Sequence, residues 1–128
     1  PENLPRLSKD MNVVFHGRVD DIERIIDASR INIAPLRYGA GAKGKISQAL
    51  ASGLPTIATT IAADGMYLHD QKSVLLADNA EAFSDAILGL HEDEVRWSLL
   101  SENGYLIAEE FFSEQAVSKE IRALLLNE

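Results

Sequence analysis

The chain has 128 residues, of which 46% are hydrophobic, so it is long enough and apolar enough for one domain with its own core. Its formal net charge of −8 excludes general nucleic-acid binding, which needs a basic face. The absence of cysteine excludes disulfides and thiolate metal sites, and no apolar run approaches the length of a membrane span.

The first eleven residues, 1–11, hold two prolines and little periodicity, and we interpret them as a leading segment. No signal-peptide pattern opens the chain, and its first residue is Pro1 instead of methionine. We therefore expect residues 1–128 to be a single domain and a piece of a longer protein.

The apolar pattern then predicts short strands that alternate with amphipathic helices. The predicted strands are residues 13–15, which should be buried, 31–36, 55–59 and 74–77. The predicted helices are one opened by Asp20 and Asp21, one over 43–52, a helical turn over 62–68, one from Asp78, a continuation over 97–111 and a closing helix over 113–128.

Local signals support several of these helices. Gly53 stands at the stop position of the 43–52 helix, and Asp78 with Glu81 resembles a capping box. The closing helix has an apolar face wider than one stripe needs, so we expect part of it to be exposed in this chain. The side chains expected to point inward from the 43–52 helix are Ile46, Ala49 and Leu50.

This order predicts an α/β fold in which a parallel sheet is covered by helices on both faces, a Rossmann-like three-layer α/β/α arrangement. Ligands of such sheets bind outside the carboxyl ends of the strands. The loops at 16–21, 37–44 and 59–66 should therefore line one edge.

The glycine-rich loop before the 43–52 helix is the strongest functional signal. Gly39, Gly41 and Gly44 have no Cβ to keep the backbone away from a ligand. Lys43 and Lys45 lie where the loop becomes a helix, and a helix start attracts phosphate. In an otherwise acidic chain, this pattern predicts a polyanion site.

Three ordered segments carry a resemblance: VVFHGRVDDI, INIAPLRYGAGAKGKI and ISQALASGLPTIATTIAADG. They resemble the C-terminal, nucleotide-binding half of GT-B fold glycosyltransferases, the large retaining group 1 family, over roughly residues 12–90. The resemblance implies an enzyme that transfers a hexosyl group from a nucleotide-diphosphate sugar, with no cofactor and no metal. It also implies a cytoplasmic enzyme, with room for peripheral contact at the inner face of the membrane.

The family's N-terminal acceptor-binding half is missing from this chain. In the family, the closing segment crosses to that half, so we expect the wide apolar face to be covered there. Many members carry two glutamates in the loop and helix, where this chain has Ala40 and Gln48. Gln48 can still hydrogen-bond a ribose hydroxyl, but it brings no charge. The expected donor-binding and phosphate-binding residues are Gly39, Ala40, Gly41, Lys43, Lys45, Gln48, Gly17 and Arg18.

Other residues near the loops leave alternatives open. Tyr38 could stack on a base or sugar, or it could pack against the protein. Asp64 could lie near the donor sugar or form a turn. We expect Thr59 and Thr60 to hydrogen-bond their own turn, and Trp97 to belong to the core.

Two other function classes stay open. With both glutamate positions altered, the domain could be a non-catalytic sugar-nucleotide-binding or assembly domain, or a plain doubly wound interaction domain with an empty loop. The sequence has no Walker sequence, no Gly-x-Ser-x-Gly elbow and no metal-ligand spacing.

Overall fold

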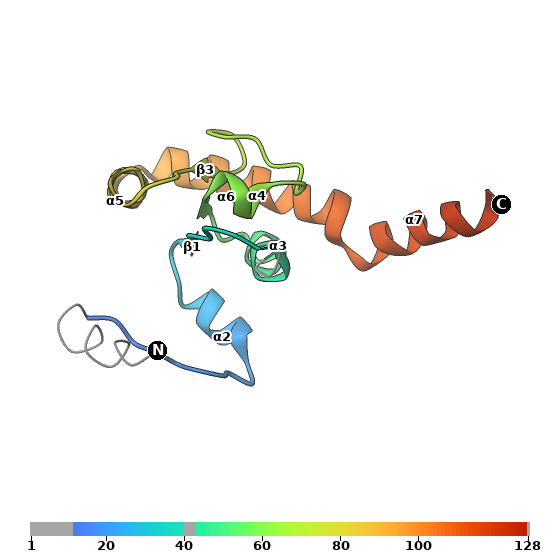
Figure 1. The fold of residues 1–128 in the computed structure, drawn as a ribbon, viewed down its shortest axis with the longest axis horizontal. Coiled ribbons are helices and arrows are strands. Elements are labelled where there is room, and N and C mark those ends of the chain that lie inside the picture. Colours follow the sequence, from blue (N-terminus) through green and yellow to red (C-terminus); the bar gives the residue numbers. More distant parts are fainter. Residues whose placement is uncertain (1–11, 40–42, 128) are drawn as a thin grey trace.

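The computed structural model describes residues 12–39 and 43–127. Its core is a three-stranded parallel sheet with helices on both sides, which confirms the predicted α/β architecture (Figure 1). The elements in chain order are α2 (Ile22–Asp27), β1 (Asn32–Ala34), α3 (Lys43–Ala51), β2 (Thr56–Ala58), α4 (Thr60–Ala63), β3 (Leu75–Leu76), α5 (Ala80–Glu92), α6 (Glu94–Ile107), the π-helical segment η1 (Ala108–Phe112) and α7 (Glu114–Leu126).

The register of the sheet separates two apolar faces. Ala34 and Ala58 are paired and point to one face, called the first face, where they lie in the core with α3. The preceding residue of each strand points to the opposite face, called the second face, on which Ile33 lies beside Ile57, and Ile57 beside Leu75. The sequence pattern of short, wholly apolar strands fits a sheet covered on both faces.

Helix α3 covers the first face with the side chains that the sequence predicted. Ile46, Ala49 and Leu50 are all buried, and the helix is followed by Gly53 at φ 74°, a conformation that favours glycine. Helix α6 packs closely against α3 at Gly104. A Cβ added there would come within 2.8 Å of the Leu50 side chain, so the close contact requires glycine.

Helix α5 covers the second face incompletely. Phe83 and Leu90 are buried over Ile57 and Leu75 in one apolar cluster. Ile33 on the edge strand β1 stays 49% exposed. This uncovered end of the second face forms part of a groove described below.

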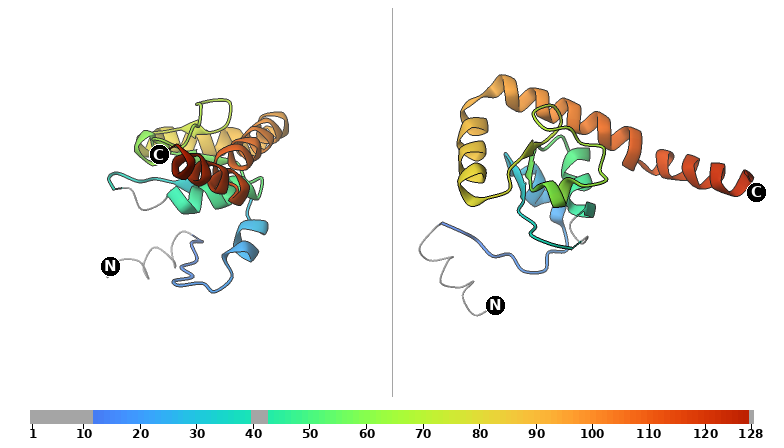
Figure 2. Two further views of the ribbon diagram at one scale, coloured as in Figure 1. Left: turned by 90° about the vertical axis from the view of Figure 1, so that its right-hand side faces the viewer. Right: turned by 45° about the horizontal axis from the view of Figure 1, so that its top comes forward.

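The predicted strand at 13–15 is wrong. Val13, Val14 and Phe15 are 37%, 70% and 44% exposed, and the segment pairs with no strand in the described structure. It runs below α2, away from the sheet, in every ribbon view (Figures 1 and 2). An apolar run becomes a strand only where a neighbouring strand accepts its backbone hydrogen bonds, and this segment does not lie along β1. The 16–21 loop therefore does not join the carboxyl edge.

The predicted capping box at Asp78 is also wrong. Asn79 is the N-cap of α5, and its side chain accepts a hydrogen bond from the Ala82 amide at 2.8 Å. Asp78 lies two residues after β3 and accepts from the amide and hydroxyl of Thr60, at 2.8 and 2.7 Å. A partner at the end of the neighbouring strand, which no local pattern shows, takes this carboxylate away from the helix.

The C-terminal helices follow the prediction, except that residues 108–112 form a π-helical segment. The 97–111 periodicity corresponds to α6 and η1, and Ser113 caps α7 by accepting from the Ala116 amide. The predicted turn at 62–68 begins earlier, as α4. No residue of α7 is buried, and the helix projects from the body (Figures 1 and 2).

Candidate functional site

The glycine loop joins the carboxyl end of β1 to the start of α3. Gly39 has φ 89°, which favours glycine, and α3 begins at Lys43. Ala40 and Gly41, two of the predicted donor-binding residues, lie outside the described residues. The first amides of a helix have no partner within the helix, so the start of α3 presents N–H donors at this edge.

Lys43 reaches across this edge to the loop that follows α4. Its side chain is half-buried, and its Nζ donates to the main-chain carbonyl of Asp64 at 2.5 Å. Gly65 follows at φ 74°, and a Cβ built there would lie 3.5 Å from Nζ. The structure therefore brings the start of α3 together with a second loop, at a residue 21 positions further along the chain.

The other predicted residues of α3 lie on the same short helix. Gly44 and Lys45 are exposed in its first turn, and Gln48 is half-buried about one turn further on. Because i and i+4 share a helix face, Gln48 lies on the same side of α3 as Gly44.

Two threonines hold the neighbouring strand ends. Thr59 Oγ1 donates to the Leu36 carbonyl at 2.7 Å and accepts from the Ala62 amide at 3.2 Å, so it caps α4 and joins the ends of β1 and β2. This confirms the prediction that Thr59 bonds its own turn. Thr60 instead bonds Asp78, and the donation from its amide, then from its hydroxyl, lowers the pKa of the Asp78 carboxyl.

Gly17 and Arg18 lie apart from these loops. Both are exposed on the segment before α2, which Figure 1 shows below α2 and apart from α3. The sequence placed them at the edge because it predicted a strand before them. Without that strand they are not brought to the site, and their contact with the donor stays a prediction.

Trp97 has a structural role. Its Nε1 donates to the Arg30 carbonyl at 2.8 Å, and the Arg30 guanidinium carbon lies 5.7 Å from the centre of its ring. It also packs against the apolar cluster of the second face, as predicted. Tyr38, in contrast, is 85% exposed beside the glycine loop, and thus packs little against the described chain.

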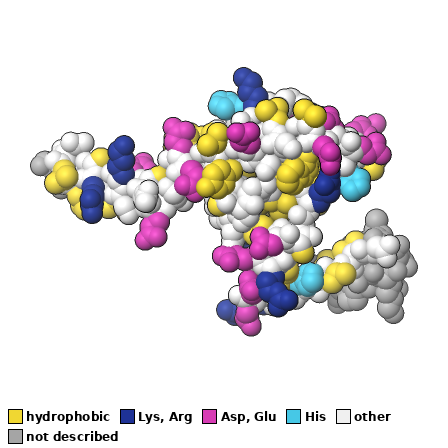
Figure 3. All heavy atoms as spheres, turned by 180° about the vertical axis from the view of Figure 1, so that it is seen from behind, with side chains coloured by type: hydrophobic (Ala, Val, Ile, Leu, Met, Phe, Trp, Pro, Cys, Tyr) yellow, Lys and Arg dark blue, Asp and Glu magenta, His cyan; other side chains and the backbone are white. Residues whose placement is uncertain are grey.

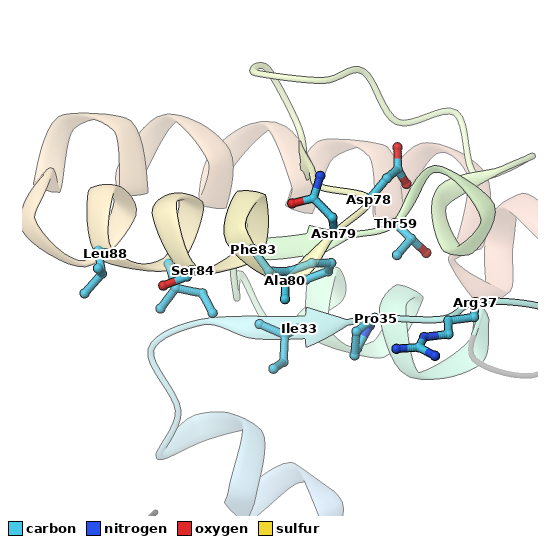
Figure 4. Close-up of a pocket in the computed structure, with 11 residues that line it drawn as sticks. Ile33, Pro35, Arg37, Thr59, Asp78, Asn79, Ala80, Phe83, Ser84 and Leu88 are labelled. Atoms are coloured by element: carbon cyan, nitrogen blue, oxygen red, sulfur yellow. The ribbon is translucent and has the colours of Figure 1, made fainter.

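A groove of about 660 Å³ lies between β1 and α5, and the sequence reasoning missed it. Ile33 and Pro35 lie on one side of the groove, opposite Ala80 and Phe83 of α5. Arg37 lies beyond the carboxyl end of β1 (Figure 4). The available sequence signal was Leu88, an apolar residue of α5 outside the predicted stripe, and its side chain is 62% exposed. The lining residues are Ile33, Pro35, Arg37, Thr59, Asp78, Asn79, Ala80, Phe83, Ser84, Ile87 and Leu88.

Within residues 12–39 and 43–127, no group of three His, Asp or Glu side chains is placed to hold a metal ion. The helices of that same part are also too short or too polar for any to cross a bilayer.

Solved structures with a similar fold include a glycosyl transferase group 1 domain and a sucrose-phosphate synthase. The chain is similar to the C-terminal domain of LpcC, a glycosyl transferase group 1 family protein from Francisella tularensis, with 19% identity and a TM-score of 0.73 over 89% of this chain and 66% of that one. It is also similar to sucrose-phosphate synthase from Thermosynechococcus elongatus, with 20% identity and a TM-score of 0.80 over 98% of this chain and 33% of that one. This chain thus spans just under two thirds of the first structure and a third of the second.

These likenesses confirm the Rossmann-like fold of a GT-B C-terminal domain. No curated protein matches the chain at a significant level. Residues 1–93 match the family described as glycosyl transferases group 1, and that match covers more than half of the sequence. The chain therefore belongs to the group 1 glycosyltransferase family.

Proposed function

We propose that this chain binds the nucleotide-diphosphate sugar donor of an enzyme that transfers a hexosyl group to an acceptor with retention of configuration. The observation that carries the proposal is the position of Lys43, at the first residue of α3, in a chain of net charge −8. The ammonium and the N–H groups of the helix start combine into a locally positive site, which suits a diphosphate.

The chemical demand of this reaction falls on the leaving group. Breaking the bond between the anomeric carbon and the diphosphate oxygen leaves negative charge on the diphosphate. Donors that are fixed before the reaction stabilise such charge most effectively. In this proposal Lys43 and the first amides of α3 supply that stabilisation, so the reaction needs no divalent metal.

The remaining residues would bind other parts of the donor. Lys45 is a second cation near the phosphates, and the Gln48 amide would hydrogen-bond a ribose hydroxyl. Gly39 lets the loop approach the ligand closely. Arg18 would have to move toward α3 when the donor binds.

We assign the acceptor to a separate N-terminal half, outside this chain. The exposed apolar side chains of α7 support this assignment. Ile121 and Leu124 are 51% and 69% exposed. They belong to a helix that projects from the body and whose surface also carries basic side chains (Figure 3). A partner domain would cover these side chains in the longer protein.

The test is a titration of this chain with UDP and GDP, followed by amide NMR signals. Shifts should concentrate on residues 39–48 and 64–65, and shifts confined to another surface would refute the site. Lys43→Ala should weaken diphosphate binding by about 1.5–3 kcal/mol, the range for a charge-assisted hydrogen bond. Uridine, which has no phosphate, should bind equally to both proteins.

Lys119→Ala is the matched control, because it removes the same charge from the exposed surface of α7. Its diphosphate affinity should equal that of the unchanged chain. If it loses as much affinity as Lys43→Ala, binding depends on net charge and not on a site at α3.

A non-catalytic sugar-nucleotide-binding domain is the second candidate. The observation that favours it is the neutral side chain at position 48, where many members of the family carry a glutamate. Turnover of a panel of donor sugars by a longer protein that contains this chain distinguishes the two. Binding with no turnover of any donor would favour the second candidate.

A further inference from the structure

We infer that the turn Asp64–Tyr67, which follows α4, is a positioning element that holds the Lys43 ammonium at the start of α3. This inference rests on the proposed function, because it describes how the phosphate-binding lysine is oriented. It assigns a role to main-chain atoms of a loop that no local pattern links to the lysine.

The contact joins two segments that are distant in sequence. Lys43 is in the first turn of α3, a position where the helix dipole disfavours a cation. A cation there benefits from an acceptor elsewhere, and the carbonyl of Asp64 supplies one at 2.5 Å.

The nature of the acceptor suits a phosphate-binding lysine. The bond goes to the main-chain carbonyl of Asp64, which carries no formal charge, and not to its carboxylate. A lysine ammonium has three donors, so one can be used for orientation while the others face a ligand. The positive charge therefore stays available to an anion.

The turn itself is fixed at its other end. Met66 is 2% exposed within the core cluster that includes residues of α3. The Tyr67 ring stacks on Phe111 of η1, with centroids 3.9 Å apart and planes 9° apart. Tyr67 has φ 60°, a sparsely populated conformation for an aromatic residue that persists only where its surroundings impose it.

Gly65 is the residue that lets the carbonyl face Lys43. A Cβ at this position would be only 3.5 Å from Nζ, an ordinary contact, so space does not require glycine. The φ of 74° does, because an L side chain is strained there. A side chain at position 65 should therefore shift the turn and release the lysine.

The experiment compares Gly65→Ala with Gly53→Ala. Gly53 has the same φ of 74°, but it follows the other end of α3 and its added Cβ would meet Ser101. Side-chain NMR of Lys43, without nucleotide, should show its signals moving toward those of the exposed Lys119 in Gly65→Ala only. Unchanged Lys43 signals in Gly65→Ala would overturn the inference.

UDP titration then tests the coupling by a double-mutant cycle with Lys43→Met. Gly65→Ala should weaken UDP binding about fivefold when Lys43 is present, and by much less in the Lys43→Met background. Equal loss in both backgrounds would overturn the inference while leaving the proposed function intact. No UDP binding by the unchanged chain would instead refute the proposed function, and the role of the turn with it.

Tyr67→Ala provides a second variant if Gly65→Ala does not fold. Tyr67 is 55% exposed, so its truncation should be tolerated, yet it removes the stack that fixes the turn. In Tyr67→Ala, the Lys43 side-chain signals should also move toward those of Lys119. The loss of UDP affinity should again be much smaller in the Lys43→Met background. An unchanged Lys43 in this variant would also count against the inference.

Discussion

Replacement of Thr59 by valine should lower the free energy of unfolding by about 2 kcal/mol, because it removes two hydrogen bonds at the carboxyl edge of the sheet. The side chain is 8% exposed, and its hydroxyl makes two hydrogen bonds, one to the Leu36 carbonyl and one from the Ala62 amide. Losing a helix N-cap costs about 1 kcal/mol. Losing the second hydrogen bond adds about 1 kcal/mol. Valine keeps the shape and leaves both backbone groups without this partner.

The assay is urea unfolding followed by fluorescence of Trp97, the only tryptophan in the chain. Thr59→Ser is the control, because it keeps the hydroxyl and removes one methyl group, which is worth about 0.8 kcal/mol. In the Val variant, the amide signals of residues 36–39 should also shift, since Leu36 leads into the glycine loop. The reasoning is refuted if valine costs less than serine, or if valine leaves the unfolding free energy unchanged.

Three further predictions concern the rest of the described structure. Asp78→Asn should lower the unfolding midpoint at pH 7. The folded-state pKa of Asp78 lies below its usual 3.8, so the ionised carboxylate stabilises the fold above that value, and this stabilisation is lost as the pH falls through the folded pKa. If Asp78→Asn lowered the midpoint by the same amount at pH 2 as at pH 7, the argument would be contradicted. Leu50→Ala, at a side chain that is 1% exposed, should cost about 2–5 kcal/mol, whereas Leu88→Ala, at 62% exposure, should cost well under half as much; similar costs would disprove the burial argument. Hydrogen exchange should be much faster in α7, where nothing is buried, than in α3; equal protection would mean that α7 is covered.

The sequence alone determined the local elements. Helix α3 could be predicted from the spacing of its apolar residues and from Gly53, because a helix face and a left-handed stop are properties of a few consecutive residues. The strands β1 to β3 could be found for the same reason, since each is a short apolar run. The order of strands and helices, together with the glycine loop, was enough to indicate the fold and the family.

Only the tertiary structure decided which groups become partners. The 13–15 run has a strand's composition, but a strand also needs a neighbouring edge, and that edge is set by the whole sheet. Asp78 bonds Thr60 instead of capping α5, because two parallel strands end side by side. Lys43 meets Asp64 for the same reason, as the loops after β1 and β2 lie at one edge. Periodicity reports which face of an element is apolar, whereas contacts between residues about 20 positions apart depend on how the elements pack.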